Sequence, residues 1–137
     1  MALLVLDEQL AGKNLVAALG ARGIDVATLA DFGVTGRPDP DVVRTIDRRH
    51  SEMWVLVTMD LNIVEEHPGF DWHRYALAWI MVREELRGSA FEASKHDVVH
   101  RHAHQIVEQA RGDHHTYTAT QRIRSRPSLT SQLRRKL

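Results

Sequence analysis

The stretch Leu3-Leu4-Val5-Leu6-Asp7-Glu8 places two acids directly after four apolar residues. A short unbroken apolar run is typical of a strand that is buried on both faces, as in a parallel sheet. Ligands of such sheets bind outside the carboxyl ends of the strands. The stretch therefore predicts a buried first strand, with Asp7 and Glu8 at the edge of the sheet where a ligand binds.

The same pattern returns at residues 54–60, where the run Trp-Val-Leu-Val-Thr-Met leads to Asp60. Between the two runs, residues 10–19 have helical spacing and residues 24–29 alternate like a strand, which indicates a right-handed βαβ unit. Asp39 before Pro40 is a helix start signal, with Asp39 as the N-cap of a helix that ends near residue 50. We expect a second, short helix over residues 61–66, capped by Asp60.

The second half of the chain is predicted from apolar runs and spacing alone. Residues 75–82 and 116–120 favour strands, and residues 94–111 have the apolar stripe of a helix. Together these elements predict an α/β fold in three layers, with a mainly parallel central sheet flanked by helices. We expect one domain over residues 1–121 and a flexible basic tail over residues 122–137.

Composition sets the broad class of protein. A chain of 137 residues with 43% hydrophobic and 26% charged residues suits one globular domain. No apolar run approaches the roughly 20 residues of a membrane span, and the start of the chain has no basic leader, so we expect a cytoplasmic protein without membrane contact. The chain has no cysteine, which excludes disulfides and thiolate zinc sites.

Charge is divided unevenly along the chain. The tail has six basic residues and no acid, and since the whole chain has 18 basic and 18 acidic residues, residues 1–121 carry a charge of −6. A basic tail on an acidic body indicates contact with a polyanion or an acidic partner, and a solvated terminus explains it about equally well. Arg122, Arg124 and Arg126 alternate, so on a strand they would share one face that meets RNA phosphates or an acidic protein.

Three acids occupy corresponding places: Asp7 after the first strand, Asp39 at a helix start and Asp60 after the third strand. Glu8 and Asp41 lie close to them in the sequence. Carboxylates clustered at one edge repel each other unless a hard cation lies between them, and Mg²⁺ prefers oxygen ligands. Such a site activates water and stabilises the charge that develops on a phosphodiester.

A structural explanation competes with the metal site. Asp39 and Asp60 are each explained equally well as N-caps, whose removal costs about 1 kcal/mol. Asp7 has no such explanation as an N-cap, and an acid at the end of a buried strand is costly unless something pairs with it. The three acids together favour the metal site.

The motifs at these positions resemble a known family. Leu4 to Gln9, Gly23-Ile24-Asp25-Val26, Gly36-Arg37-Pro38-Asp39 and Val55 to Asp60 are similar, in order and spacing, to a compact branch of the PIN-like domains, the VapC-type toxins of bacterial type II toxin–antitoxin pairs. The resemblance covers residues 3–66. It implies a Mg²⁺-dependent endoribonuclease (Mn²⁺ is possible) that hydrolyses RNA with a metal-activated water and is neutralised by a cognate antitoxin protein.

Carried over to this chain, the resemblance makes Asp7, Asp39 and Asp60 the catalytic metal ligands, with Thr58 supporting them. The chain departs from the family pattern at two places. Gln9 stands where asparagine is usual, which keeps an amide. Asn62 stands where a further aspartate is usual, which removes a ligand charge and weakens cation affinity. Glu65 or Glu66 would restore that charge if either lies close enough.

Other readings remain open from the sequence. A catalytically degenerate PIN-like module that binds RNA or a partner is favoured by Asn62. A receiver-like signalling domain also has acids after its first and third strands. It needs a lysine after a late strand, however, and the only lysines of this chain, Lys13, Lys95 and Lys136, follow no convincing strand. It also gives Asp39 no role. A zinc site is a further alternative for the stripe His96, His100 and His104, which we interpret as a polar helix face. A homodimer is possible, and the sequence does not identify its surface.

Overall fold

The chain forms one mainly parallel sheet, seen in a computed structural model that describes residues 2–60, 62–81, 87–112, 115–120 and 132–135. The strands lie in the order β2-β1-β3-β4-β5-β6. The first five pair in parallel and β6 pairs antiparallel with β5. Their bounds are β1 Leu3–Leu6, β2 Val26–Thr28, β3 Trp54–Thr58, β4 Ala76–Met81, β5 His115–Thr120 and β6 Gln132–Arg135.

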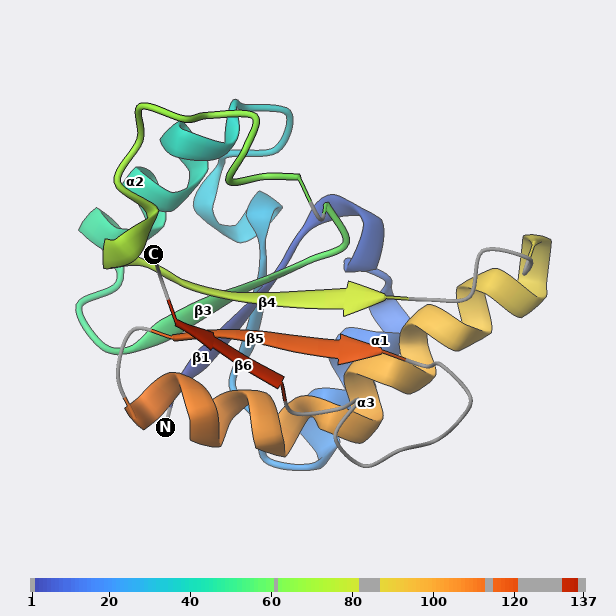
Figure 1. Cartoon of the computed structure of the whole chain (residues 1–137). Helices are drawn as coiled ribbons and strands as arrows, with labels where there is room; N and C mark the ends of the chain where they lie inside the picture. The colour runs from blue at the N-terminus through green and yellow to red at the C-terminus, as the bar shows by residue number, and fades with distance from the viewer. Residues whose placement is uncertain (1, 61, 82–86, 113–114, 121–131, 136–137) are drawn as a thin grey trace.

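Helices cover both faces of this sheet (Figure 1). The helices α1 (Lys13–Ala21) and α3 (Gly88–Gly112) lie on one face, and α2 (Asp39–Arg49) lies on the other. Short 3₁₀ turns follow β1 at Glu8–Leu10, follow β2 at Leu29–Phe32 and precede β4 at Trp72–Arg74. The layers are therefore helix, sheet and helix, as the sequence predicts.

Strand β1 shows why the sheet is buried on both faces. Leu4 and Leu6 pack in the core shared with α1 and α3, whereas Val5, one residue away, packs in the core shared with α2. Val55 and Leu56 of β3 divide between the two cores in the same way. Since successive strand residues point to opposite faces, a strand between two helical layers needs apolar residues at every position.

Most predicted elements are confirmed, and three differ. Residues 62–66 form turns and no helix. Helix α3 starts at Gly88, six residues before the predicted start at 94, and the positive φ of this residue (57°) suits a glycine. Residues 132–135 lie in the stretch predicted as a flexible tail, and they add strand β6 to the sheet instead.

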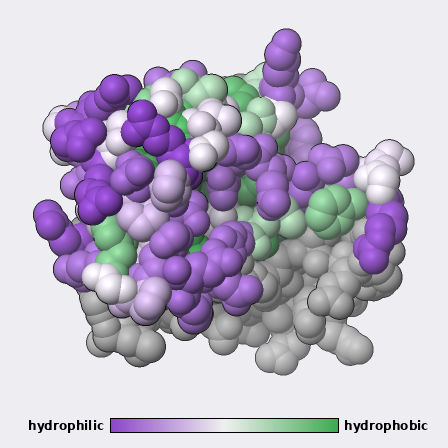
Figure 2. All heavy atoms as spheres, turned by 90° about the horizontal axis from the view of Figure 1, so that it is seen from above, coloured by the Kyte–Doolittle hydropathy of each residue, from purple (hydrophilic) through white to green (hydrophobic). Residues whose placement is uncertain are grey.

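The surface and the helices agree with an ordinary globule. Seen from the side of α2, the molecule is largely hydrophilic, with apolar residues in small patches between charged ones (Figure 2). In the part of the chain that the structure describes, no helix is long and apolar enough to cross a membrane.

Helix α3 buries the polar side chain of His102. His102 is 4% exposed, and its Nδ1 lies 3.2 Å from Oε1 of Gln105. Its Nε2 is buried and has no hydrogen-bond partner among the described residues. Burial lowers the pKa of His102 below its ordinary value of 6.5, because the charged form loses water.

This burial predicts a pH dependence of stability. The unfolded chain takes up a proton at His102 near pH 6.5 and the folded chain only at lower pH, so the free energy of unfolding falls as the pH drops below about 6.5. His102→Leu removes this proton uptake. Urea unfolding at pH 7.5, 6.5 and 5.5 is expected to show a shallower loss for the variant than for wild type. Equal pH slopes for the two proteins contradict the prediction, and His104→Gln, an exposed change on the same helix, is the control.

Candidate metal centre

The sheet brings two of the predicted acids to one point. Strands β1 and β3 are parallel neighbours with Leu6 opposite Val57, so Asp7 and Asp60 both follow carboxyl ends at the same edge. Strand β1 lies between β2 on one side and β3 on the other, so the strand order reverses at β1. Open α/β sheets bind ligands at such a point. A hollow of about 330 Å³ opens there, lined by Asp7, Glu8, Gln9, Met59 and Asp60.

Asp7 is held by two hydrogen bonds. Its Oδ1 accepts from the backbone N–H of Glu8 at 2.8 Å, which makes Asp7 the N-cap of the 3₁₀ turn after β1. Its Oδ2 accepts from the hydroxyl of Thr58 at 2.7 Å. The prediction that Asp7, unlike Asp39 and Asp60, has no capping role is therefore wrong, because the sequence does not reveal the 3₁₀ turn that it caps.

Thr58 connects the two strand ends. Its side chain is fully buried, and besides donating to Asp7 its Oγ1 accepts from the backbone N–H of Asp60 at 3.1 Å. A single hydroxyl thus orients one carboxylate and fixes the backbone that carries the next.

Asp60 begins a turn and not a helix. Its Oδ1 accepts from the N–H of Asn62 at 3.0 Å, and its backbone carbonyl accepts from Nε1 of Trp79 on β4 at 2.9 Å. The prediction that Asp60 caps a helix is therefore wrong, although its side chain does accept a backbone hydrogen bond. An aspartate that bonds the N–H two residues on is a common turn device.

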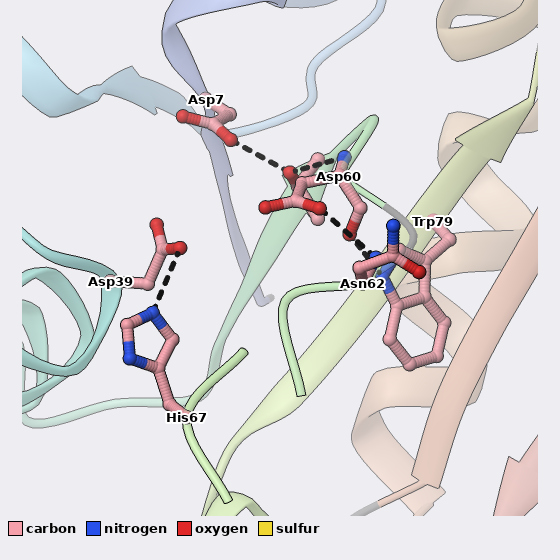
Figure 3. Close-up of polar contacts among 7 residues, drawn as sticks. Asp7, Asp39, Asp60, Asn62, His67 and Trp79 are labelled. Carbon is pink, nitrogen blue, oxygen red and sulfur yellow. Dashed lines mark hydrogen bonds and ion pairs between the residues drawn. The ribbon is translucent and has the colours of Figure 1, made fainter. Parts of the chain in front are cut away.

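Asp39 does not cap the helix that it begins. The N-cap of α2 is Pro38, one residue earlier than predicted, and this helix has no side-chain cap hydrogen bond. Burial raises the pKa of Asp39, and the negative charges of Asp7 and Asp60 raise it further, while His67 opposes the shift. The carboxylates of the three aspartates face a common space (Figure 3). The fold therefore places the three acids around one space, and the group whose ligand atoms all lie within 4.8 Å of one another is Asp39, Glu66 and His67.

The supporting residues are placed less uniformly. Glu8 is exposed, and its Oε1 accepts from the N–H of Gly36 at 2.8 Å, which ties the loop before α2 to the end of β1. Asp41 is half exposed and pairs with Arg44 at 3.1 Å. Asn62 lies on the far side of Asp60 from Asp7 and Asp39 (Figure 3). Of these three, Glu8 acts on the position of α2, and neither Asp41 nor Asn62 joins the three aspartates.

Two residues join the site that sequence reasoning left unplaced or missed. Glu66 approaches Asp60, and the hydrogen bond between the two side chains, followed by the charge of Asp60, raises the pKa of Glu66. Nε2 of His67 lies 3.6 Å from Oδ2 of Asp39 (Figure 3). The only sequence signal for them is a Glu-His pair shortly after Asp60, in a segment predicted as a helix end.

The donor set fits a divalent cation. Asp7 and Asp60 line the hollow, and the group whose ligand atoms all lie within 4.8 Å of one another is Asp39, Glu66 and His67. Burial and then repulsion from Asp7 and Asp60 raise the pKa of Asp39, and a hydrogen bond to Asp60 and then repulsion from it raise the pKa of Glu66. A bound cation would offset this repulsion, and oxygen ligands of this kind suit Mg²⁺ or Mn²⁺. The residues present therefore fit the metal that the family resemblance implies.

The remaining predicted sites are a histidine stripe and a group of arginines. His96, His100 and His104 are on α3, with the rings of His96 and His100 5.9 Å apart. Among the described residues they form no group with metal-ligand geometry. Arg122, Arg124 and Arg126 lie outside the described residues. Comparisons of the chain with protein-family models, curated proteins and solved structures find no match.

The Thr58 hydroxyl is a test of how the site is held. Thr58→Val removes the donor to Asp7 and the acceptor for the Asp60 N–H while keeping the shape of the side chain. We expect it to lower the free energy of unfolding by roughly 1–3 kcal/mol, because two polar groups lose a partner in a partly buried site. Urea unfolding measures this loss. Thr58→Ser keeps the hydroxyl and should recover much of it, and equal stability of the Val and Ser variants contradicts the assignment.

Asp39 allows a test of the repulsion. Because its pKa is raised in the folded state, ionised Asp39 destabilises the fold above that pKa, and the penalty disappears below the ordinary value of 3.8. In chelator at pH 7.5, Asp39→Asn is expected to raise Tm by a few degrees, and in Mg²⁺ the advantage should shrink or reverse. Thermal unfolding measures both. Asp41→Asn is the matched control in the same helix turn, and a lower Tm for Asp39→Asn in chelator overturns the interpretation.

Proposed function

We propose that this protein is a divalent-metal-dependent endoribonuclease of the PIN-like, VapC-type toxin class. Asp7, Asp39 and Asp60 are the catalytic and metal-binding residues, Mg²⁺ is the principal cofactor, and Mn²⁺ is the alternative. RNA is the substrate, and a cognate antitoxin is the protein partner.

The position of Asp39 is the observation that carries this proposal. Asp39 comes from α2, on a different segment from the two strand ends, yet its pKa responds to Asp7 and Asp60. It caps no helix, and its side chain is 28% exposed, so it is held partly buried beside two like charges. A site for a cation explains why a carboxylate is placed there.

The chain's own groups define what the site does to a phosphodiester. In hydrolysis, the oxygen of water forms a bond to phosphorus, the bond to one ribose oxygen breaks, and that oxygen takes up a proton. When bound, the divalent cation lowers the pKa of water and stabilises the negative charge that develops on the phosphate. Asp7, fixed by Thr58 and the Glu8 N–H, and Asp60, fixed by its turn, hold their oxygens at set positions at the hollow. The partly buried Asp39 faces these two carboxylates from α2.

The geometry supports a metal-dependent phosphodiesterase, and the resemblance of residues 3–66 supports RNA as its substrate. The toxin role, the antitoxin and a homodimer are supported by that resemblance alone. The basic residues of the chain end suit either RNA phosphates or an acidic partner.

The receiver-like reading fits less well. Lys95 comes from α3 and not from the end of a late strand, and its Nζ donates to the carbonyl of Gln9 at 2.9 Å and pairs with Glu92 at 3.0 Å. A lysine engaged in this way does not serve an incoming phosphoryl group. Asp39, which a receiver does not use, contributes to the acidic site instead.

RNA cleavage tests the proposal directly. We expect the purified full chain, free of antitoxin, to cut a mixed RNA pool in Mg²⁺ and to stop when EDTA is added. Asp7→Asn and Asp60→Asn are expected to lower the rate at least 100-fold, since each removes a ligand charge without changing side-chain size. Product formation on denaturing gels gives the rates.

The control variant is Asp31→Asn, an exposed acid whose carboxylate binds the backbone of Thr28 outside the site. It should cleave at close to the wild-type rate. A folded protein that cuts no RNA in Mg²⁺ or Mn²⁺ is a binding module and not a nuclease. Cleavage that survives both aspartate changes places the activity elsewhere or in a contaminant.

A further inference from the structure

A carboxylate from α2 and two side chains from the turn after β3 meet beside the three aspartates. The ligand atoms of Asp39, Glu66 and His67 all lie within 4.8 Å of one another. In Figure 3 the imidazole of His67 is directed at the carboxylate of Asp39. Asp39 belongs to this group and also faces the other two aspartates of the proposed nuclease centre.

The separation of the two facing atoms suits a shared ion better than a direct contact. Nε2 of His67 is 3.6 Å from Oδ2 of Asp39, which is too long for a good hydrogen bond. Two ligand atoms that each bind one ion at about 2.1 Å lie about 3–3.4 Å apart. Small side-chain rotations would therefore bring both atoms onto one ion.

The imidazole sets the kind of metal. Mg²⁺ prefers oxygen ligands, whereas imidazole nitrogen suits the first-row transition metals and Zn²⁺. A cluster of acids alone carries no such preference. His67 is a nitrogen donor that adds no negative charge, and it is partly buried, with 30% of its side chain exposed. Its ring also lies 6.2 Å from that of Trp72, which limits how far it turns away.

We propose that Asp39, Glu66 and His67 form a transition-metal position, for Mn²⁺ or Zn²⁺, beside the Mg²⁺ ligands Asp7 and Asp60. This inference rests on the proposed function through Asp39, which serves both positions. Glu66 then supplies the carboxylate that Asn62 fails to supply, from a different place in the turn. The chain would hold Mn²⁺ more tightly than an oxygen-only site does.

Binding of Mn²⁺ tests the proposal without any RNA. Mn²⁺ is titrated into the full chain and free ion is followed by electron paramagnetic resonance, and Mg²⁺ affinity is measured by its competition with Mn²⁺. His67→Gln and Glu66→Gln are each expected to weaken Mn²⁺ binding at least tenfold, and His67→Gln should change Mg²⁺ affinity less than threefold. His104→Gln, an exposed histidine on α3, is the matched control and should bind like wild type. Unchanged Mn²⁺ affinity in His67→Gln overturns the proposal, as does an equal loss for the two metals.

A second measurement does not depend on a variant folding correctly. Pulsed electron paramagnetic resonance of Mn²⁺ on the wild-type chain detects coupling to the ¹⁴N of a bound imidazole. We expect this coupling in wild type and in His104→Gln, and its absence in His67→Gln. No ¹⁴N coupling in the wild-type chain shows that no imidazole binds the ion, and the proposal then fails.

The two proposals fail separately. If the chain cuts RNA in Mg²⁺ but His67→Gln binds Mn²⁺ like wild type, the nuclease proposal holds and the transition-metal position is refuted. If Mn²⁺ binding requires His67 but the folded chain cuts no RNA, the nuclease proposal is refuted and the transition-metal position holds.

Discussion

Like-charge repulsion beside the carboxyl ends of β1 and β3 is the constraint on which the rest of the site depends. Parallel pairing fixes where Asp7 and Asp60 lie, and hydrogen bonds from Thr58 and Asn62 hold their carboxylates. Asp39 is delivered to the same place by α2, without a capping bond to offset the cost. Glu8 accepts a hydrogen bond from the N–H of Gly36, in the loop that leads into α2, and this contact helps to hold the start of the helix in place. The fold therefore holds Asp39 partly buried beside two like charges, a cost that His67 offsets in part and that a bound cation would offset further.

The layers of the fold could be predicted from the sequence because burial on both faces leaves a direct trace in it. Residues 3–6 and 54–57 are apolar at every position, and the structure divides them between two helical cores. The exact residues at which helices and turns begin leave no such trace in the sequence. The N-cap of α2 is Pro38, one residue before the predicted Asp39, and a 3₁₀ turn follows β1. As a result, Asp7, for which no capping role is predicted, is an N-cap, and Asp39, the predicted N-cap, is not.

The turn after β3 could not be predicted for a different reason, which is that residues distant in the chain determine its shape. Trp79 of β4 donates to the carbonyl of Asp60, so the path of the turn depends on a strand that begins 16 residues later. The same turn carries Asn62 away from the aspartates and brings Glu66 toward Asp60. Counting positions from Asp60 therefore identifies the wrong residue as the next acid of the site.

The strand order by itself does not choose among the readings, since a nuclease, a binding module and a receiver all place acids after the first and third strands. Asp39 is more selective. A receiver has no use for it, and a module that binds partners without metal gains nothing from a carboxylate held beside two others and partly out of water. Asparagine has the same size and would carry no such cost. His67, 3.6 Å from Asp39, offsets part of that cost, and a cation at this place would offset more of it, whatever the cation acts upon.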